Sequence, residues 1–537
     1  MNQQLSSLRS QLLAVVLLAA VLHGVSIARS LLPAQDGLKF IRIARQFQND
    51  PWPDVVRDTD QHPLYPALIA AVEPLFARLA GPGPDTWRIA AQWVAALASV
   101  LLLFPLYGIT RTIFDERIAC IAVAIYALLP VPAEVGHDTL SDSLGLLSVL
   151  LCLRWGAVAL RTADWRPALA AGLAGGVGYL ARPEAILAPA ALGLAWVFAR
   201  MRSWDFRAPV ASGALPAMAL SALVFVGGYA LIKGQVTEKL ALRHAALLGS
   251  QQVMIRTVPQ LLPKGLNDAR WDFSPKEESD HTVIRHPLQA VRWMACEWWD
   301  ELCWGFAVMA IWGLVRRRFI WKRCRVRDPG DRGGSERLVL AVFAGVFSLA
   351  LLRHTAALGY LSGRHLLPLV LISVPWAAAG TFVCLRGLGL KLPWSPRAAW
   401  ATCILASGLV ALTLVVYQLR PSHPTRWGHW ASGRWLAEHA SPSDLVLDTR
   451  GWARFIANAP GYDYWHVRQA LTDSHLAYVV VGHEELEAKS PRARTLTALL
   501  AYAATPVQDF PVFVSDRNVG ARIYRFHQPV SWEGLRP

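Results

Sequence analysis

Long apolar segments almost free of charge are the feature that most constrains how this chain of 537 residues folds. A helix needs about 20 apolar residues to cross the hydrocarbon core of a bilayer, and several segments reach that length. The composition agrees, because 54% of the residues are hydrophobic and only 17% are charged. It excludes disorder and argues against a single soluble enzyme, so we predict a polytopic membrane protein.

Eleven membrane-spanning helices are predicted from this pattern. The stretch 168–199 admits two readings, either one broken helix or two short helices separated by Arg182–Glu184. Only two short helices keep the nine Lys and Arg residues of 316–337 on the same side as the other basic loops. We therefore predict spans at about 11–32, 88–109, 118–133, 140–160, 168–181, 185–199, 209–232, 301–315, 338–352, 365–385 and 399–418.

The distribution of Lys and Arg among the loops agrees with the predicted topology. The net charge is +15, which in a soluble protein would suggest nucleic acid as a partner. If the N-terminus is cytoplasmic, the inside loops together with Arg9 hold 20 Lys and Arg, whereas short outside loops such as 134–139 hold almost none. This is the positive-inside bias of membrane proteins. We therefore expect a multi-pass protein of the plasma (inner) membrane with no nucleic-acid partner.

Three longer segments are predicted to lie outside the cytoplasm: 33–87, 233–300 and the tail 419–537. The tail has the pattern of a small α/β domain. Its expected elements are strands at 445–447 and 478–481, helices around 427–440 and 484–503, and a closing hairpin of 510–514 and 521–526. The predicted fold class is thus an α-helical polytopic membrane domain, residues 1–418, followed by an extracytoplasmic α/β domain, residues 419–537.

The first outer loop carries the candidate functional side chains. Asp36 follows the first span directly, and a carboxylate at the membrane edge is a functional candidate because facing lipid is costly. The alternative is a helix N-cap. Lys39, one turn later, tempers the pKa of Asp36, touches phosphate, or forms a simple salt bridge. Asp58 and Asp60 offer a second carboxylate or form a solvated turn, and His62 either lines a pocket or caps a turn.

A second cluster of ionisable residues is predicted at the next outer loop. It consists of Glu134, His137, Asp138 and Asp142. The spacing of four places Asp138 and Asp142 on one helical face, with His137 beside them. A histidine with carboxylates is one ligand set for a divalent ion, but the spacing does not fix a coordination geometry, so no metal site is predicted.

Four motifs in this chain resemble, in the same order, those of the C-type glycosyltransferase superfamily (GT-C). The resemblance covers about residues 30–385 and is strongest to bacterial relatives of protein O-mannosyltransferases and of lipid A aminoarabinose transferases, many of which carry a similar tail domain. Gly37 departs from the family pattern, because many relatives have a second acidic residue there, and this puts a carboxylate pair and a metal in doubt. The motifs are Asp36-Gly37-x-x-Phe40-x-x-x-Ala44, His62-Pro63-Leu64-Tyr65-Pro66, the glycine-rich 172–184 and Gly363-Arg364-His365-Leu366-Leu367-Pro368.

The resemblance implies an integral-membrane glycosyltransferase. Such an enzyme moves a sugar, with inversion, from a polyprenyl-phosphate carrier to an extracytoplasmic glycan, lipid or protein. It implies Asp36 as the base and Arg364 as the first choice for the lipid phosphate, with Arg182 second. The alternatives are snorkelling for Arg364 and a helix C-terminus cation for Arg182. Asp138 and His62 are secondary candidates for substrate binding.

Two other classes of function remain alternatives at this point. A transporter or lipid-linked sugar flippase would place ionisable residues at mid-bilayer. Here the predicted spans are nearly free of charge, and Arg154, the main interior charge, lies towards the cytoplasmic end. A non-catalytic assembly scaffold would use the tail as its binding module. The crowding of charges at the outer face favours the enzyme.

Overall fold

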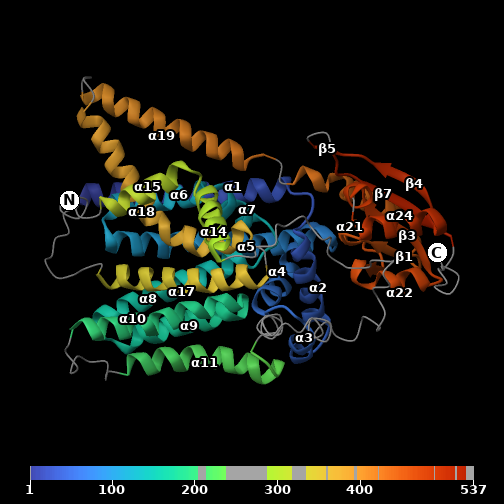
Figure 1. Cartoon of the computed structure of the whole chain (residues 1–537), viewed down its shortest axis with the longest axis horizontal. Coiled ribbons are helices and arrows are strands. Elements are labelled where there is room, and N and C mark those ends of the chain that lie inside the picture. The colour runs from blue at the N-terminus through green and yellow to red at the C-terminus, as the bar shows by residue number, and fades with distance from the viewer. Residues whose placement is uncertain are drawn as a thin grey trace.

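The structure is a computed structural model that describes residues 2–203, 213–236, 287–316, 334–358, 361–391, 396–420, 423–488, 490–514 and 517–527. It is mostly helical, and Figure 1 shows a bundle of long helices next to a small C-terminal domain that contains the sheet. Most of the predicted outer loop 233–300 and of the basic loop 316–337 falls outside the described residues.

The predicted spans coincide with helices wherever the structure describes them. Among the described residues, six helices are long and apolar enough to cross a bilayer, or seven if α6 and α7, which are bent by 63° at Leu129, form one span. The multi-pass membrane architecture is therefore confirmed. The bundle helices are α1 (Asn2–Arg29), α5 (Pro84–Ile113), α6 (Glu116–Leu128), α7 (Pro130–His137), α8 (Asp142–Thr162), α9 (Trp165–Ala181), α10 (Leu187–Ser203), α11 (Ala214–Lys233), α14 (Pro287–Glu301), α15 (Gly305–Val315), α17 (Gly334–Leu358), α18 (Gly363–Lys391) and α19 (Pro396–Gln418).

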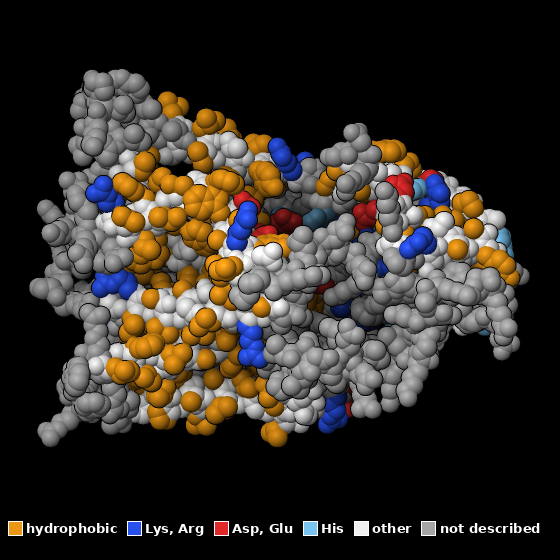
Figure 2. Space-filling model, viewed as in Figure 1, with side chains coloured by type: hydrophobic (Ala, Val, Ile, Leu, Met, Phe, Trp, Pro, Cys, Tyr) orange, Lys and Arg blue, Asp and Glu red, His pale blue; other side chains and the backbone are white. Residues whose placement is uncertain are grey.

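The outside of the bundle has the character of a lipid-facing surface. Hydrophobic side chains cover its visible face in Figure 2. Large apolar residues such as Leu220 and Leu349 are exposed there by 68% and 69%. Such exposure is costly in water but not in hydrocarbon, so these faces suit a bilayer.

The ambiguous stretch 168–199 forms two helices. The helix α9 ends at Ala181, Arg182 is extended, and the short 3₁₀ turn η1 (Pro183–Ile186) leads into α10. Figure 1 shows α9 and α10 next to each other in the bundle. The glycines of α9 allow close packing, because a Cβ at Gly172 would lie 2.1 Å from the carbonyl oxygen of Met218 on α11.

The first outer loop forms a layer of three helices between the bundle and the C-terminal domain: α2 (Gln35–Asn49), α3 (Trp52–Asp58) and α4 (Leu64–Ala80). The apolar stripe of α2, which includes Phe40, Ile41 and Ala44, packs in one buried cluster with Tyr65 of α4. The hydroxyl of Tyr65 donates a hydrogen bond of 2.9 Å to the carbonyl oxygen of Ala91 on α5. This packing fixes α2, and with it Asp36, to the bundle.

The tail folds into an α/β domain around a five-stranded sheet with the order β2-β1-β3-β7-β4. Strands β2, β1 and β3 are parallel, and β7 is antiparallel to both β3 and β4. The helices are α20 (Trp427–His439), α21 (Trp452–Ala457), α22 (Val467–Thr472), α23 (His483–Glu487) and α24 (Pro491–Ala503); the strands are β1 (Leu445–Asp448), β2 (Gly461–Asp463), β3 (Leu476–Gly482), β4 (Ala504–Phe510), β5 (Phe513–Val514), β6 (Arg517–Asn518) and β7 (Ala521–Phe526).

The closing hairpin differs from the prediction in its first strand. We predicted residues 510–514, but β7 pairs with β4, which begins at Ala504, and only the two-residue strands β5 and β6 pair beyond Phe510. Most of β4 is exposed at the edge of the sheet, so it lacks the alternating apolar pattern that marks a strand. Its Pro506 is tolerated there because an edge strand needs fewer backbone donors.

Candidate active site

Asp36 and Arg364 meet where α2 and α18 begin. The carboxylate Oδ2 of Asp36 accepts a hydrogen bond of 2.7 Å from Nη2 of Arg364. Asp36 lies in the first turn of α2, whose N-cap is Ala34, so the N-cap role that we weighed for Asp36 is wrong. The side chains of Asp36 and Arg364 remain 50% and 34% exposed, so a ligand can reach the pair.

Arg182 belongs to the same charged group. It forms an ion pair with Asp142, the first residue of α8, and lies 3.6 Å from the carboxylate of Glu184. Burial lowers the pKa of Arg182, but the charges of Asp142, Glu184 and Asp36 outweigh it and raise the pKa above its ordinary value. The stem of Arg182 passes over Gly145, where a Cβ would lie 2.9 Å from its Cδ. Two permanent cations therefore adjoin Asp36.

Asp138 lies beneath the start of α2 and not in the exposed group. Its Oδ1 accepts hydrogen bonds from the backbone N–H of Ala34 at 2.8 Å and of Thr139 at 2.7 Å. Its Oδ2 lies 3.4 Å from His423 and 3.6 Å from Arg426 of the C-terminal domain. Burial raises the pKa of Asp138, but the hydrogen bond from His423 and the charge of Arg426 outweigh it and lower the pKa to about 2. Its geometry is that of an anchor for α2, whereas we predicted contact with substrate.

The other predicted site residues have different surroundings. His62 is buried between Tyr179 and Tyr229, with ring centroids at 4.9 and 4.8 Å, in an aromatic cluster at the ends of α9 and α11. Lys39 lies one turn beyond Asp36 and is half-buried. Asp58 and Asp60 are exposed at the turn after α3, which agrees with the alternative of a solvated turn.

The carboxylates of the second outer loop are each held by a basic side chain. Glu134 lies 3.2 Å from His423, and Asp142 pairs with Arg182. Within the described part of the chain, no group of three or more His, Cys, Asp or Glu is arranged to hold a metal ion.

The sequence analysis missed three residues of the C-terminal domain: Arg426 and Trp452, which contact the backbone just before α2, and His423, which contacts Asp138. Their partners lie about 300 to 400 positions earlier in the chain, and no local pattern reports such contacts. The available signal was the position of His423 and Arg426, which follow the last span directly and face the membrane edge. Figure 2 shows a hollow at this junction in which acidic and histidine side chains are visible.

The departure from the family motif at Gly37 has a steric reason. A Cβ at Gly37 would lie 1.7 Å from Oγ1 and 2.9 Å from the carbonyl oxygen of Thr139, so no side chain fits there. Gly37→Ala should destabilise the protein by about 1–3 kcal/mol, as overpacking does, and lower its melting temperature. Gly345→Ala on α17, where no atom lies within 4 Å, is the control and should leave the melting temperature unchanged. Equal melting temperatures for both variants would contradict the close contact at Gly37.

The lowered pKa of Asp138 should make the stability of the fold depend on pH. Because its folded pKa lies below the ordinary value of 3.8, the ionised form stabilises the fold above pH 4, and this contribution disappears as the pH falls from 3.8 to about 2. It amounts to about 2 kcal/mol. Thermal unfolding at pH 7 and pH 3 should show a smaller acid-induced loss of stability in Asp138→Asn than in the wild type. An equal loss in both proteins would contradict the shifted pKa.

The fold of the whole chain is similar to that of solved GT-C glycosyltransferases. ArnT from Cupriavidus metallidurans bound to undecaprenyl phosphate matches with a TM-score of 0.57 at 12% identity, over 96% of this chain and 97% of that protein. Its apo state matches with a TM-score of 0.55 at 14% identity and the same coverage. The Archaeoglobus fulgidus oligosaccharyltransferase tethered with an acceptor peptide gives 0.50 at 13% identity, over 97% of this chain and 74% of that one. The chain is thus a polytopic membrane protein with the GT-C fold.

Within that class, residues 61–226 match the family described as dolichyl-phosphate-mannose-protein mannosyltransferase. The matched segment begins at the His62–Pro66 motif and includes the glycine-rich α9 with Arg182. The resemblance to the GT-C superfamily that the sequence motifs indicated is confirmed by this match and by the fold. A comparison with curated proteins finds no match.

Proposed function

We propose that this protein is an integral-membrane glycosyltransferase that moves a sugar from a polyprenyl-phosphate carrier to an extracytoplasmic acceptor with inversion. The observation that carries the proposal is the meeting of Asp36 and Arg364, which are 328 positions apart, at 2.7 Å. The fold similarity to ArnT with bound undecaprenyl phosphate supports the choice of donor.

Asp36 is the proposed base. The acceptor hydroxyl oxygen attacks the anomeric carbon from the face opposite the phosphate, and its proton passes to the carboxylate of Asp36. The bond between the anomeric carbon and the phosphate oxygen breaks, and polyprenyl phosphate departs with the bonding electrons. Attack from the opposite face inverts the anomeric configuration. The ionised carboxylate is the form of Asp36 that accepts a proton.

Arg364 and Arg182 are the proposed partners of the departing phosphate. Negative charge grows on the phosphate oxygens in the transition state, and a guanidinium stabilises it with a permanent charge and two parallel donors. Arg364 lies at the first turn of α18, at the level where a lipid head group meets the membrane surface. Arg182 is held by Asp142 and Glu184, which fix the position of its guanidinium.

The ion pair between Asp36 and Arg364 is then the resting state of the site. An in-line displacement places the base and the leaving phosphate on opposite faces of the sugar, so this pair has to separate. The donor phosphate replaces Asp36 as the partner of Arg364 and frees the carboxylate for the acceptor. Binding of the donor therefore also activates the base.

The proposed enzyme faces the outside of the plasma (inner) membrane, with a cytoplasmic N-terminus and an extracytoplasmic C-terminal domain. The charge asymmetry of the loops supports this orientation. The hollow between the bundle and the C-terminal domain in Figure 2 is the proposed entrance for the acceptor.

The test is a transfer assay with the purified full-length protein reconstituted in lipid vesicles. A panel of polyprenyl-phosphate hexoses and pentoses is supplied together with extracytoplasmic glycans, lipids and proteins as acceptors. Release of free polyprenyl phosphate with appearance of the opposite anomer on an acceptor is expected for one donor class. Movement of an intact donor between leaflets without release would support the flippase alternative and overturn the proposal.

A further inference from the structure

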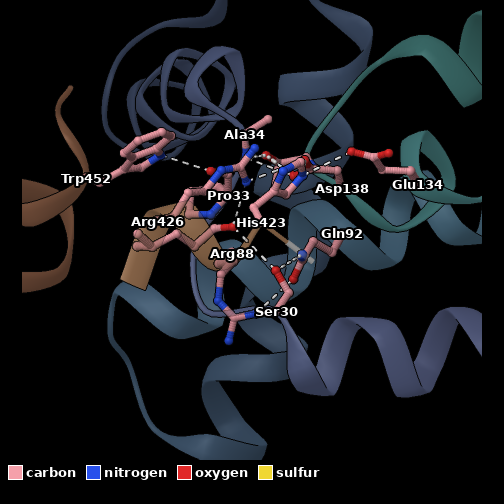
Figure 3. Close-up of polar contacts among 12 residues, drawn as sticks. Ser30, Pro33, Ala34, Arg88, Gln92, Glu134, Asp138, His423, Arg426 and Trp452 are labelled. Carbon is pink, nitrogen blue, oxygen red and sulfur yellow. Dashed lines mark hydrogen bonds and ion pairs between the residues drawn. The ribbon is translucent and has the colours of Figure 1, made fainter. Parts of the chain in front are cut away.

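The short segment 30–34, which leads from α1 to Asp36, has polar contacts to both the helix bundle and the C-terminal domain (Figure 3). On the bundle side, the amide of Gln92 on α5 donates a hydrogen bond of 3.0 Å to the hydroxyl of Ser30. The N–H of Ala34 donates to Asp138 at 2.8 Å. Between these two residues, the hydroxyl of Ser30 donates to the carbonyl oxygen of Leu32 at 3.4 Å, and the C-terminal domain supplies further contacts to Leu32 and Pro33.

Two side chains of the C-terminal domain hold that stretch. Nη1 of Arg426 donates to the carbonyl oxygen of Leu32 at 3.2 Å, and Nε1 of Trp452 donates to the carbonyl oxygen of Pro33 at 3.0 Å. The guanidinium of Arg426 also lies over the ring of Trp452, 5.2 Å from its centroid, so each side chain fixes the other. Figure 3 shows both pointing at the same turn of backbone.

Asp138 links the two sets of contacts. The same guanidinium nitrogen of Arg426 lies 3.6 Å from Oδ2 of Asp138, whose other oxygen binds the N–H of Ala34. The side chains of Arg426 and Asp138 are only 12% and 8% exposed, and an ion pair screened so little by water has a strong geometric preference. The tail domain is thereby tied to the backbone two residues before Asp36.

We infer that Arg426 and Trp452 are positioning residues for Asp36. Through them, the C-terminal domain helps to hold the proposed base in place for catalysis. Ala34 is the N-cap of α2, so a displacement of residues 32–34 moves the first turn that carries Asp36. A misplacement of about 1 Å at a reacting group costs up to about 100-fold in rate. The inference rests on the proposed function, because Asp36 has to be the base for its position to set the rate.

The first test measures position and needs no substrate. Hydrogen–deuterium exchange is followed in the peptide that covers residues 33–40 of the full-length reconstituted protein. Trp452→Phe keeps an aromatic ring beside Arg426 but removes the donor to Pro33, and Arg426→Gln removes the cation. Both should speed exchange in this peptide about 5-fold, as expected from loss of one hydrogen bond. The matched controls are Trp435→Phe and Arg525→Gln, which lie in the same domain at another aromatic pair, around Tyr478, and should leave this peptide unchanged.

The second test measures turnover with the donor identified by the transfer assay. Both variants should lower kcat about 10-fold or more with a KM for the donor within about twofold of wild type, because Arg364 is untouched. Arg426→Lys, which retains a cationic donor, should recover part of the rate. Unchanged exchange in both variants would overturn the inference whatever the assay shows. Faster exchange with normal kcat would also overturn it, whereas full activity of Asp36→Asn would instead overturn the proposed base.

Discussion

Asp36→Asn is expected to lower kcat for sugar transfer about 1,000-fold, within the range that general-base catalysis contributes. Asparagine has nearly the shape of aspartate but cannot accept the proton of the acceptor hydroxyl. The substitution also removes the negative partner of Arg364, whose Nη2 lies 2.7 Å from the carboxylate of Asp36. Donor affinity should therefore stay the same or increase while turnover collapses. The measurements are release of polyprenyl phosphate and equilibrium binding of the donor in reconstituted protein.

The control for Asp36→Asn is Asp60→Asn, which changes an exposed carboxylate of the same outer loop. It should retain wild-type turnover, because Asp60 lies at a solvated turn where its side chain accepts from Gln61. Turnover that survives in Asp36→Asn and is lost in Asp60→Asn would move the base to that turn. A parallel loss of donor binding and of turnover in Asp36→Asn would indicate a role in binding.

The sequence predicted the membrane helices, because their positions depend on local patterns of apolar residues. It also singled out Asp36, Arg364 and Arg182, each at the outer end of a predicted span. That these three come together follows from interactions between segments far apart in the sequence, which no single motif contains. The order of the GT-C motifs supplied that link as an expectation.

The surroundings of Asp138 and Gly37 also depend on packing between distant segments, so the sequence did not reveal them. The resemblance makes Asp138 a secondary candidate for substrate binding, because a second acidic loop facing Asp36 fits the family pattern; the sequence did not reveal that it is buried beneath Ala34. Its partners His423 and Arg426 lie nearly 300 residues later in the chain. The space available at Gly37 is likewise a tertiary property, set by its contact with Thr139. Side chains that connect two parts of a fold carry no periodic signal, whereas those that line a helix face do.

Arg364→Gln is expected to weaken donor binding about 100-fold, because it removes a charge-assisted, two-pronged contact to a phosphate in a site partly shielded from water. Arg364→Lys should recover only part of that loss, since an ammonium retains the charge but not the planar pair of donors. The measurement is equilibrium binding of polyprenyl phosphate to vesicles that contain the protein. The fall in kcat/KM should be at least as large as the fall in affinity.

The decisive comparison for Arg364 is with Arg353→Gln on the neighbouring helix α17. Arg353 is exposed near the outer end of α17, as expected of an arginine that only reaches for the membrane surface. General attraction of an anionic lipid by surface charge would weaken binding equally in both variants and would fall with salt. A specific phosphate site predicts a large effect at Arg364 alone, largely insensitive to salt. Because Arg364 is also the resting partner of Asp36, Arg364→Gln should weaken donor binding, whereas Asp36→Asn should not.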